Sequence, residues 1–317
     1  MPAFSATAPG KTILFGEHAV VYGEPAIAVP VQSLRARAVV TPRVSGKSGQ
    51  IRIEAPDISL SAELNDLDPD HPLRAAVRGA VSDHSLDRVP ACQILVTSTI
   101  PPASGLGSSA AVSAAVIRAL SGFLGLRLTD EEVSRAAFDV EKIYHGTPSG
   151  IDNSVVVFQQ PVFYQKGQEI QFINIPSSFS LVIGCTGTPG NTRKAVNEVR
   201  EKWLEEPDRF NKLFGEIGEI TRRALNAITR GEPGDLGPFM DENHRLLQDL
   251  GVSTPELDHL AQAARKSGAL GAKLSGGGLG GCLIALVNSQ ADAVQESLLE
   301  EGAAGVYLTT IGSPSGT

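Results

Sequence analysis

The residues whose types and spacing could do chemistry begin with a run of small side chains from Pro101 to Ser109. The run reads Pro-Pro-Ala-Ser-Gly-Leu-Gly-Ser-Ser, and a long helical pattern follows it. A helix start leaves about four backbone N–H groups unpaired and carries roughly half a positive charge, and glycines let the backbone approach a ligand closely. The run lacks the lysine of a Walker A loop, and its match to G-x-G-x-x-A has no acidic residue at a strand end about 20 positions on. It therefore predicts a phosphate-holding loop, the alternative being an ordinary strand-to-helix turn that needs small residues.

Ser109 and Glu141 are candidate ligands of a divalent cation. A hydroxyl at the start of a phosphate-holding helix can bind Mg2+, which prefers hard oxygen ligands. On a helix predicted over residues 130–144, Glu141 falls about 80° from Val133, the centre of the apolar stripe, and so lies at the edge of that stripe. An edge carboxylate can face a cleft between elements, although a flank glutamate can also be merely solvated.

Charged residues also occur where the surrounding pattern is apolar. Lys11, Glu17 and His18 fall within eight residues of a strand-rich stretch, so each needs a partner or a ligand. Asp152 follows Pro-Ser-Gly-Ile, just before an apolar run interpreted as a strand, where it can protrude into a site or bond to its own backbone in a turn. The run KLSGGGLGGC, which begins at Lys273, is either a flexible hairpin or a segment whose backbone lies against a ligand or against the first loop.

The elements that must position these residues follow from the hydrophobic pattern. A box of Thr129 and Glu132 caps the second of two helices in the first half of the chain. The strands are expected at residues 12–16, 26–31, 33–40, 93–98, 154–158, 181–184, 282–287 and 306–311, with turns at Gly-Glu and Pro-Val in the first part, and one further strand before the last glycine cluster. Helices are expected at residues 108–124, 130–144, 192–204, 208–230, 235–250, 256–267 and 290–300.

Strands and helices mix without a regular alternation, which favours two α+β domains over a doubly wound sheet. The periodicity is lost around residues 160–178, so we place the domains at residues 1–170 and 171–317. A chain of 317 residues has ample length for two such domains.

Composition and charge exclude several classes of protein. The formal net charge is -8, which is the wrong sign for a surface that binds nucleic acid or an anionic membrane. The three cysteines are far apart and form no C-x-x-C pair, so neither a disulfide framework nor a thiolate zinc site is expected. The first residues lack the pattern of a secretory leader, and no run approaches the ~20 apolar residues that span a bilayer. We expect a cytoplasmic protein.

Three motifs of this chain, taken together, resemble the GHMP kinase superfamily, named for galactokinase, homoserine kinase, mevalonate kinase and phosphomevalonate kinase. In the family's order they are APGKTILFGEHAVVYG, IPPASGLGSSAA and KLSGGGLGGC. Within the superfamily, GEHAVVYGEPAIAVPV and HGTPSGIDN are similar to the mevalonate kinases. The third motif departs from the usual Gly-Ala-Gly-Gly-Gly-Gly, because Gly277 replaces the alanine and Leu279 replaces one glycine.

The resemblance implies a fold and a set of functional residues. The first half should adopt the family's ribosomal protein S5 domain 2-like domain and the second half a ferredoxin-like domain, with the active site in the cleft between them. By the resemblance, Asp152 and Lys11 are catalytic, Ser109 and Glu141 bind Mg2+, and the acceptor pocket includes Glu17, His18, Asp152 and Thr186. The positions expected to bind ATP are Lys11, Ser98, Pro102, Ala103, Ser104, Gly105, Leu106, Gly107, Ser108 and Ser109.

The implied activity is transfer of the γ-phosphoryl group of ATP to the 5-hydroxyl of mevalonate, with Mg2+, in isoprenoid biosynthesis. Neither nucleic acid nor membrane is expected as a partner, and the resemblance allows a homodimer. Phosphomevalonate or a sugar is the alternative acceptor on the same scaffold, and Arg193 and Lys194 keep the first of these open. A protein that binds ATP and ligand without turnover is the alternative from another class.

Overall fold

The computed structural model describes residues 2–81, 86–145 and 148–312, and these divide by their internal contacts into two compact units. Unit 1 holds the chain up to Gly10, Leu34–Pro101 and Gly107–Gln159. Unit 2 holds Lys11–Ser33, Pro102–Leu106 and the chain from Gln160 onward. Each unit is thus assembled from separate segments, and the single boundary expected at residue 170 stays a prediction.

Unit 1 contains a mixed sheet in which β3 runs parallel to β5, while β4 pairs with β3 and the second half of β2 pairs with β5, both antiparallel. Buried and half-buried residues alternate along β3, as expected for a strand with one face on the core. The strands are β1 (Phe4–Phe15), β2 (Ala26–Pro42), β3 (Ile51–Ala55), β4 (Leu60–Glu63) and β5 (Cys92–Ser98).

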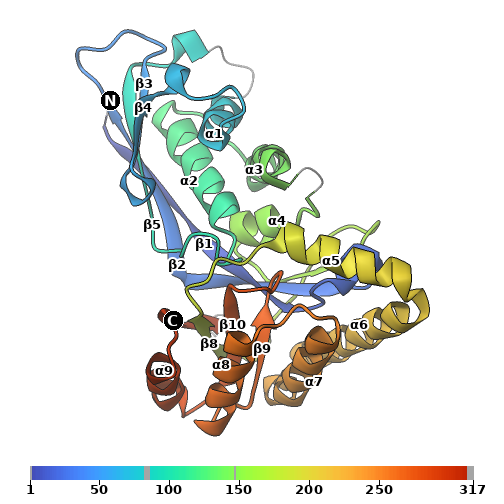
Figure 1. Ribbon diagram of the computed structural model, residues 1–317. Helices are drawn as coiled ribbons and strands as arrows, with labels where there is room; N and C mark the ends of the chain where they lie inside the picture. Colours follow the sequence, from blue (N-terminus) through green and yellow to red (C-terminus); the bar gives the residue numbers. More distant parts are fainter. Residues whose placement is uncertain (1, 82–85, 146–147, 313–317) are drawn as a thin grey trace. The chain divides into compact units, whose positions relative to one another are not determined.

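Four helices of unit 1 pack against one another, with α2 in contact with the other three and with β5 (Figure 1). They are α1 (Pro72–Val81), α2 (Ser108–Phe123), α3 (Asp130–His145) and α4 (Ile151–Phe158). The segment of α2 is rich in alanine, which favours helix formation. Most of its other side chains are apolar or small, so the helix can be buried on nearly every side. The predicted capping box of α3 is confirmed, because Thr129 N–H donates to Glu132 and Glu132 N–H donates back to Thr129 Oγ1.

The strand expected at residues 154–158 is wrong, because this run forms most of helix α4. A short apolar run rich in valine has no periodicity that separates a strand from a buried helix. Tertiary packing against α2 and α3 decides in favour of the helix, which begins after Gly150 at a φ of 85°. Asp152 therefore lies in the first turn of a helix rather than in a loop.

The turn expected at Pro30-Val31 is also wrong, because β2 continues through both residues. Proline cannot donate to a strand ladder, which is why it suggested a break. Pro30 falls between the stretch that pairs with β6, residues 26–28, and the stretch that pairs with β5, residues 36–42, so neither β5 nor β6 needs its missing N–H.

Unit 2 contains a four-stranded antiparallel sheet in the order β11-β8-β10-β9, and β6 and β7 extend the ladder of the first residues of β2. Its strands are β6 (Val162–Tyr164), β7 (Gln171–Phe172), β8 (Phe179–Cys185), β9 (Gly271–Ser275), β10 (Cys282–Val287) and β11 (Gly305–Ile311). Every residue of β9 and β10 is buried, which explains the continuous apolar sequence of β10.

Helices cover the sheet of unit 2, with α8 against β9 and β10, α9 against β8 and β11, and α7 against β9. They are α5 (Thr192–Glu205), α6 (Pro207–Arg230), α7 (Leu236–Asp249), α8 (Pro255–Lys266) and α9 (Ala291–Glu300). All five agree with the predicted ranges to within two residues, and the predicted α+β class is confirmed. None of the helices in the described part of the chain is both long and apolar enough to cross a membrane.

Short 3-10 turns link the elements. The sequence pattern did not predict strands β3, β4, β6 and β7 or helix α1. The 3-10 turns are η1 (Ala19–Tyr22), η2 (Pro56–Ile58), η3 (Leu64–Asp66), η4 (Leu86–Arg88) and η5 (Pro233–Asp235).

One expectation from the cysteines is wrong, because Cys185 and Cys282 form a disulfide. The two residues are 97 positions apart, and they are direct partners in the antiparallel register of β8 and β10. Register is a tertiary property, so the spacing in the sequence carries no sign of this pair. Cys92 is free and buried, and burial raises the pKa of its thiol to about 11.

Candidate active site

The first glycine-rich loop is anchored to the start of the chain in unit 2. Leu106 C=O accepts a hydrogen bond of 2.9 Å from Lys11 N–H, and the loop residues Ser104 and Leu106 are buried. Ala103 and Gly105 have positive φ angles of 53° and 81°. The loop backbone is therefore tightly coiled, and small residues are needed because bulky ones are strained in this conformation.

The third motif lies against this loop, which was one of the alternatives for it. A Cβ atom on Gly281 would lie 3.2 Å from Ser104 O, and one on Gly276 would lie 4.0 Å from Gly105 Cα. The approach at Gly281 is tighter than side-chain atoms usually make, whereas the distance at Gly276 is ordinary van der Waals contact. The five glycines of KLSGGGLGGC thus have a packing role that a flexible hairpin would not need.

The two departures of the third motif each have a structural counterpart. A Cβ atom on Gly277 would lie 2.6 Å from Thr192 Oγ1 and 2.7 Å from Thr192 Cα, so the usual alanine does not fit beside this threonine. Leu279 has a φ of 55°, where the family has glycine, and its N–H donates to Val252 C=O at 2.8 Å. The hydrogen bond helps to hold a backbone conformation that leucine rarely adopts.

Glu17 and His18, predicted to need partners, both find them in the third motif. Glu17 Oε1 accepts from Lys273 Nζ, and the two side chains are 1% and 0% exposed. His18 Nε2 lies 2.9 Å from Gly277 C=O, and because a carbonyl only accepts, this nitrogen carries the ring proton. Burial lowers the pKa of His18, so the ring is neutral at physiological pH.

Thr12 and Thr186 complete the contacts to the third motif. Thr12 Oγ1 lies 2.7 Å from Ser275 Oγ, which also donates to Ile13 C=O. Thr186 donates to Gly281 C=O through both its backbone N–H and its hydroxyl, at 2.9 and 3.0 Å. The predicted residues Glu17, His18 and Thr186 are thus gathered around one glycine-rich segment of unit 2.

In unit 1, Gly107 precedes the first turn of α2 with a φ of 72°, and Ser109 lies within that turn. Ser109 Oγ donates to Glu141 Oε1, and Glu141 is only 2% exposed. The sequence placed Glu141 at the edge of the apolar stripe, where it could face another element, and α3 does turn it toward α2. The predicted pair of oxygen ligands is therefore brought together.

Asp152 belongs to the same neighbourhood of unit 1. Glu141 reaches Ser109 near the end of α3, and α4 begins only six residues after His145. The far end of α4 is held farther along α2, because Arg118 donates to Val157 C=O at 2.8 Å. Asp152 thus lies in the first turn of a helix that packs against both α2 and α3.

Ser98 and Lys11 are two further predicted residues. Ser98, at the end of β5, accepts from Ile100 N–H at 3.1 Å, and its own N–H donates to Asp57. Lys11 is buried to 7% exposure in unit 2, whereas Asp152 belongs to unit 1, so their predicted pairing stays a prediction. In the HGTPSGIDN motif, Gly146 and Thr147 lie outside the described residues.

The sequence reasoning missed Lys273 as an individual residue. The signal was present, because a lysine inside the otherwise apolar strand Gly-Ala-Lys-Leu-Ser must be paired if the strand is buried. Burial raises the pKa of the Glu17 carboxyl and lowers the pKa of the Lys273 ammonium, while the charge of each partner favours ionisation of the other.

Comparisons with known proteins identify the family. Residues 72–160 match the GHMP kinases N terminal domain, and residues 224–304 match the GHMP kinases C terminal domain. The mevalonate kinase of Thermococcus sibiricus is 36% identical over 313 residues, with 92% of each chain covered. The mevalonate kinase of Pyrococcus horikoshii is 38% identical, with 89% of this chain and 88% of its own covered.

A solved structure agrees with these relatives. The crystal structure of L. major mevalonate kinase in complex with R-mevalonate has a TM-score of 0.83 and 31% identity, and the match covers 98% of this chain and 97% of the other. The chain therefore belongs to the GHMP kinase family, within the group of the mevalonate kinases.

Proposed function

We propose that this protein transfers the γ-phosphoryl group of ATP to the 5-hydroxyl of mevalonate and so produces 5-phosphomevalonate for isoprenoid synthesis. The named relatives are mevalonate kinases, and the L. major enzyme was crystallised with R-mevalonate. The observation in this chain that carries the proposal is the start of α2, where Ser109 is bonded to the buried carboxylate of Glu141 behind a glycine-rich loop.

Ser109 and Glu141 fit a magnesium site. Both present oxygen atoms, the donor type that Mg2+ prefers, and Mg2+ usually takes only one or two protein oxygens together with waters and phosphates. Bound Mg2+ supplies charge neutralisation to nucleotide phosphates. The described residues contain no cluster of three or more His, Cys, Asp and Glu that could hold a metal, so a hydroxyl-carboxylate pair is the candidate that remains.

Each catalytic residue has a distinct proposed role. Phosphoryl transfer needs alignment of the reactants and stabilisation of charge more than covalent chemistry by the protein. Asp152 orients the attacking hydroxyl and accepts its proton. Lys11 keeps that carboxylate ionised and stabilises the transferring group, while N–H groups at the start of α2 hold the phosphates.

An assay with several acceptors tests the proposed function. ADP release is measured with mevalonate, phosphomevalonate, homoserine and galactose, and the product is located by 31P NMR. We expect mevalonate to give the highest kcat/KM and a phosphate ester on its primary hydroxyl. A higher kcat/KM for phosphomevalonate or galactose, or ATP binding without turnover of any acceptor, would contradict the proposal. The homodimer and the cytoplasmic location are further expectations, which size measurement and cell fractionation test.

The substitution Asp152→Asn tests the role of this carboxylate. It should lower kcat by about 10²–10⁴-fold, the usual contribution of a positioned base, while ATP binding persists. Asp292→Asn is the matched control, because Asp292 is likewise in the first turn of a helix, α9, and should leave kcat unchanged. Full activity of the Asp152→Asn variant would remove Asp152 from the mechanism.

A further inference from the structure

The ion pair of Glu17 and Lys273 is buried more completely than is needed to hold together the two chain segments that carry these residues. Both side chains are 1% exposed or less, and Lys273 Nζ also donates to Leu274 C=O at 2.8 Å. The ammonium lies 5.9 Å from the ring centre of Phe15. Lys273 Nζ is thus occupied by protein acceptors, so we expect it to act through Glu17.

Stability does not explain this pair. Taking two charges out of water costs several kcal/mol per ion, and apolar residues of similar volume often replace a buried pair with no loss of stability. Other bonds already join the same two segments, namely those of Thr12 with Ser275 and of His18 with Gly277. The pair is therefore better explained by a need for a charged carboxylate at position 17.

One oxygen of that carboxylate is unused. Glu17 Oε1 is bonded to Lys273, whereas Oε2 is buried and has no hydrogen-bond partner among the described residues. A buried acceptor without a partner is costly, and it is retained where a ligand supplies the missing donor. A hydroxyl group is the donor that the proposed acceptor substrate offers.

We propose that Lys273 is a positioning residue that keeps the Glu17 carboxylate ionised and fixed, so that Glu17 Oε2 accepts a hydrogen bond from a hydroxyl of the phosphoryl acceptor. The inference rests on the proposed function, because it takes Glu17 as part of the acceptor pocket. It goes beyond the family resemblance, which assigned no role to Lys273. Lys273 contributes to acceptor binding and has no contact with the nucleotide.

The charged groups around this pair make the effect visible in a pH profile. Lys273 is the charged residue that acts on Glu17. The neutral ring of His18 follows Glu17 in the sequence, and His244 of α7 is the titratable group that Lys273 also influences. Burial, helped by the cations Arg265 and Lys273, lowers the pKa of His244 to about 4, so this ring stays neutral from pH 6 to pH 9. Loss of Lys273 removes the largest of the influences that lower the pKa of Glu17, so that its carboxyl then ionises only at a higher pH.

The test compares Lys273→Met, Glu17→Gln and the double variant, with mevalonate as acceptor. Lys273→Met should raise the KM for mevalonate roughly 10–100-fold, the loss expected for a hydrogen bond to a charged group, and leave the KM for ATP within about twofold. Between pH 6 and pH 9 the KM of this variant should fall as Glu17 ionises, while that of the wild type stays level. Lys212→Met is the matched control, since Lys212 is exposed and pairs with Glu216 on the surface.

The double variant keeps the test decisive if Lys273→Met does not fold. It has no uncompensated charge, so it should fold better than either single variant. If Lys273 acts through Glu17, the double variant and Glu17→Gln have the same KM for mevalonate. A further rise in KM in the double variant, or an unchanged KM in Lys273→Met, overturns the inference.

The wild type distinguishes this failure from failure of the proposed function. Turnover of mevalonate by the wild type with no effect of Lys273→Met overturns the inference alone. Preference for one of the other three acceptors overturns the proposed function alone, and the same variants measured with that acceptor then decide the inference. Absence of turnover with all four acceptors overturns both.

Discussion

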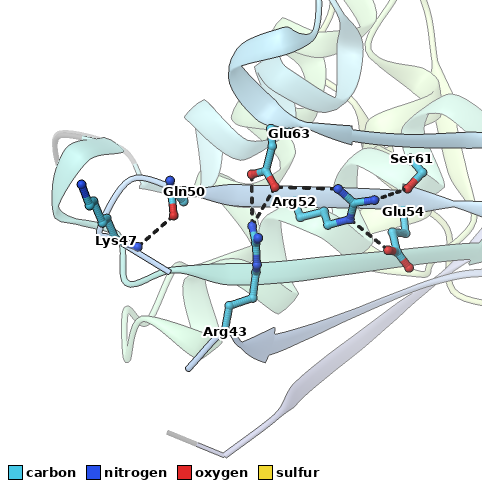
Figure 2. A network of polar contacts seen from close by, with 7 residues as sticks. All are labelled: Arg43, Lys47, Gln50, Arg52, Glu54, Ser61 and Glu63. Carbon is cyan, nitrogen blue, oxygen red and sulfur yellow. Dashed lines mark hydrogen bonds and ion pairs between the residues drawn. The ribbon is translucent and has the colours of Figure 1, made fainter. Parts of the chain in front are cut away.

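Charged side chains of this protein form ion pairs in two regions, one exposed to water and the other almost completely buried. In unit 1, Arg43 bonds to both oxygens of Glu63 at 2.8 and 3.1 Å, and Arg52 bonds to Glu54 and Ser61 (Figure 2). The charged side chains of this network, which come from β3, β4 and the residue after β2, are about one-third exposed. In unit 2, Lys273 and Glu17 form a single pair that excludes water almost completely.

Further polar contacts lie along the edge of β9. Asp241 and His244, three residues apart on one face of α7, accept hydrogen bonds from Ala272 N–H and Leu274 N–H at 3.0 and 3.2 Å. Side chains of a helix thus satisfy the edge that no further strand covers. Polar groups are needed here, because unpaired backbone groups in this buried strand would be costly.

The difference shows what each network is for. Exposed ion pairs contribute about 0–1 kcal/mol to stability, because water solvates the charges when the pair is broken. The unit 1 network therefore does little more than order the side chains around β3 and β4. A buried charge cannot be replaced by water, so each partner of the buried network depends strongly on the other. Substitutions in the two regions should therefore differ strongly in their effect on the free energy of unfolding.

The largest effect is expected for Lys273→Met, which leaves Glu17 buried without its counter-charge. The free energy of unfolding should fall by about 3–5 kcal/mol, whereas Glu17→Gln combined with Lys273→Met should be within about 1 kcal/mol of the wild type. Urea denaturation followed by circular dichroism measures both. Equal losses in the single and the double variant would show that lysine packing, not charge, stabilises this region.

An intermediate effect is expected from the pH dependence of the buried edge. His244 accepts at Nδ1, so protonation of that nitrogen breaks the bond to Leu274 N–H. Because its folded pKa, about 4, lies below the ordinary value of 6.5, its contribution is present above pH 6.5 and is lost as the pH falls toward 4. Lowering the pH from 7 to 4.5 should therefore cost about 2 kcal/mol through this residue.

His244→Asn is the matched variant for that measurement, because an amide oxygen can accept from Leu274 N–H and does not titrate. Its free energy of unfolding should fall less steeply than that of the wild type over the same pH range. Parallel slopes for the two proteins would place the acid sensitivity in other groups.

The smallest effect is expected in the exposed network of unit 1. Arg52→Ala removes the bonds to Glu54 and Ser61 and should change the free energy of unfolding by less than about 1 kcal/mol. The difference should shrink further in 1 M salt, because screening weakens exposed pairs. A loss as large as that of Lys273→Met, measured by the same urea titration, would remove the distinction between the two networks.

Much of the candidate site was predictable from local patterns. The glycine-rich loop, the helix that follows it and the capping box of α3 are local features, and helix start signals lie within a few residues of one another. The position of Glu141 at the edge of its helix followed from the helical period, and its bond to Ser109 agrees with that position. Long helices such as α6 were predictable for the same reason, since their apolar period repeats many times.

Other features had no local signal. The run of residues 154–158 became a helix because α2 and α3 cover it, and β2 passed through Pro30 between its pairings with β6 and with β5. The disulfide of Cys185 with Cys282 depends on the register of β8 and β10. Each of these depends on neighbours that are distant in the sequence.

The sequence by itself determined the three glycine-rich and charged motifs, their order and the kind of chemistry that they support, because residue type and spacing decide which groups can hold phosphate and accept a proton. Only the tertiary structure decided which residues are partners, above all Lys273 for Glu17, which is 256 positions away. The physical reason is that burial, and with it the energy of a charge, arises only when distant segments exclude water together.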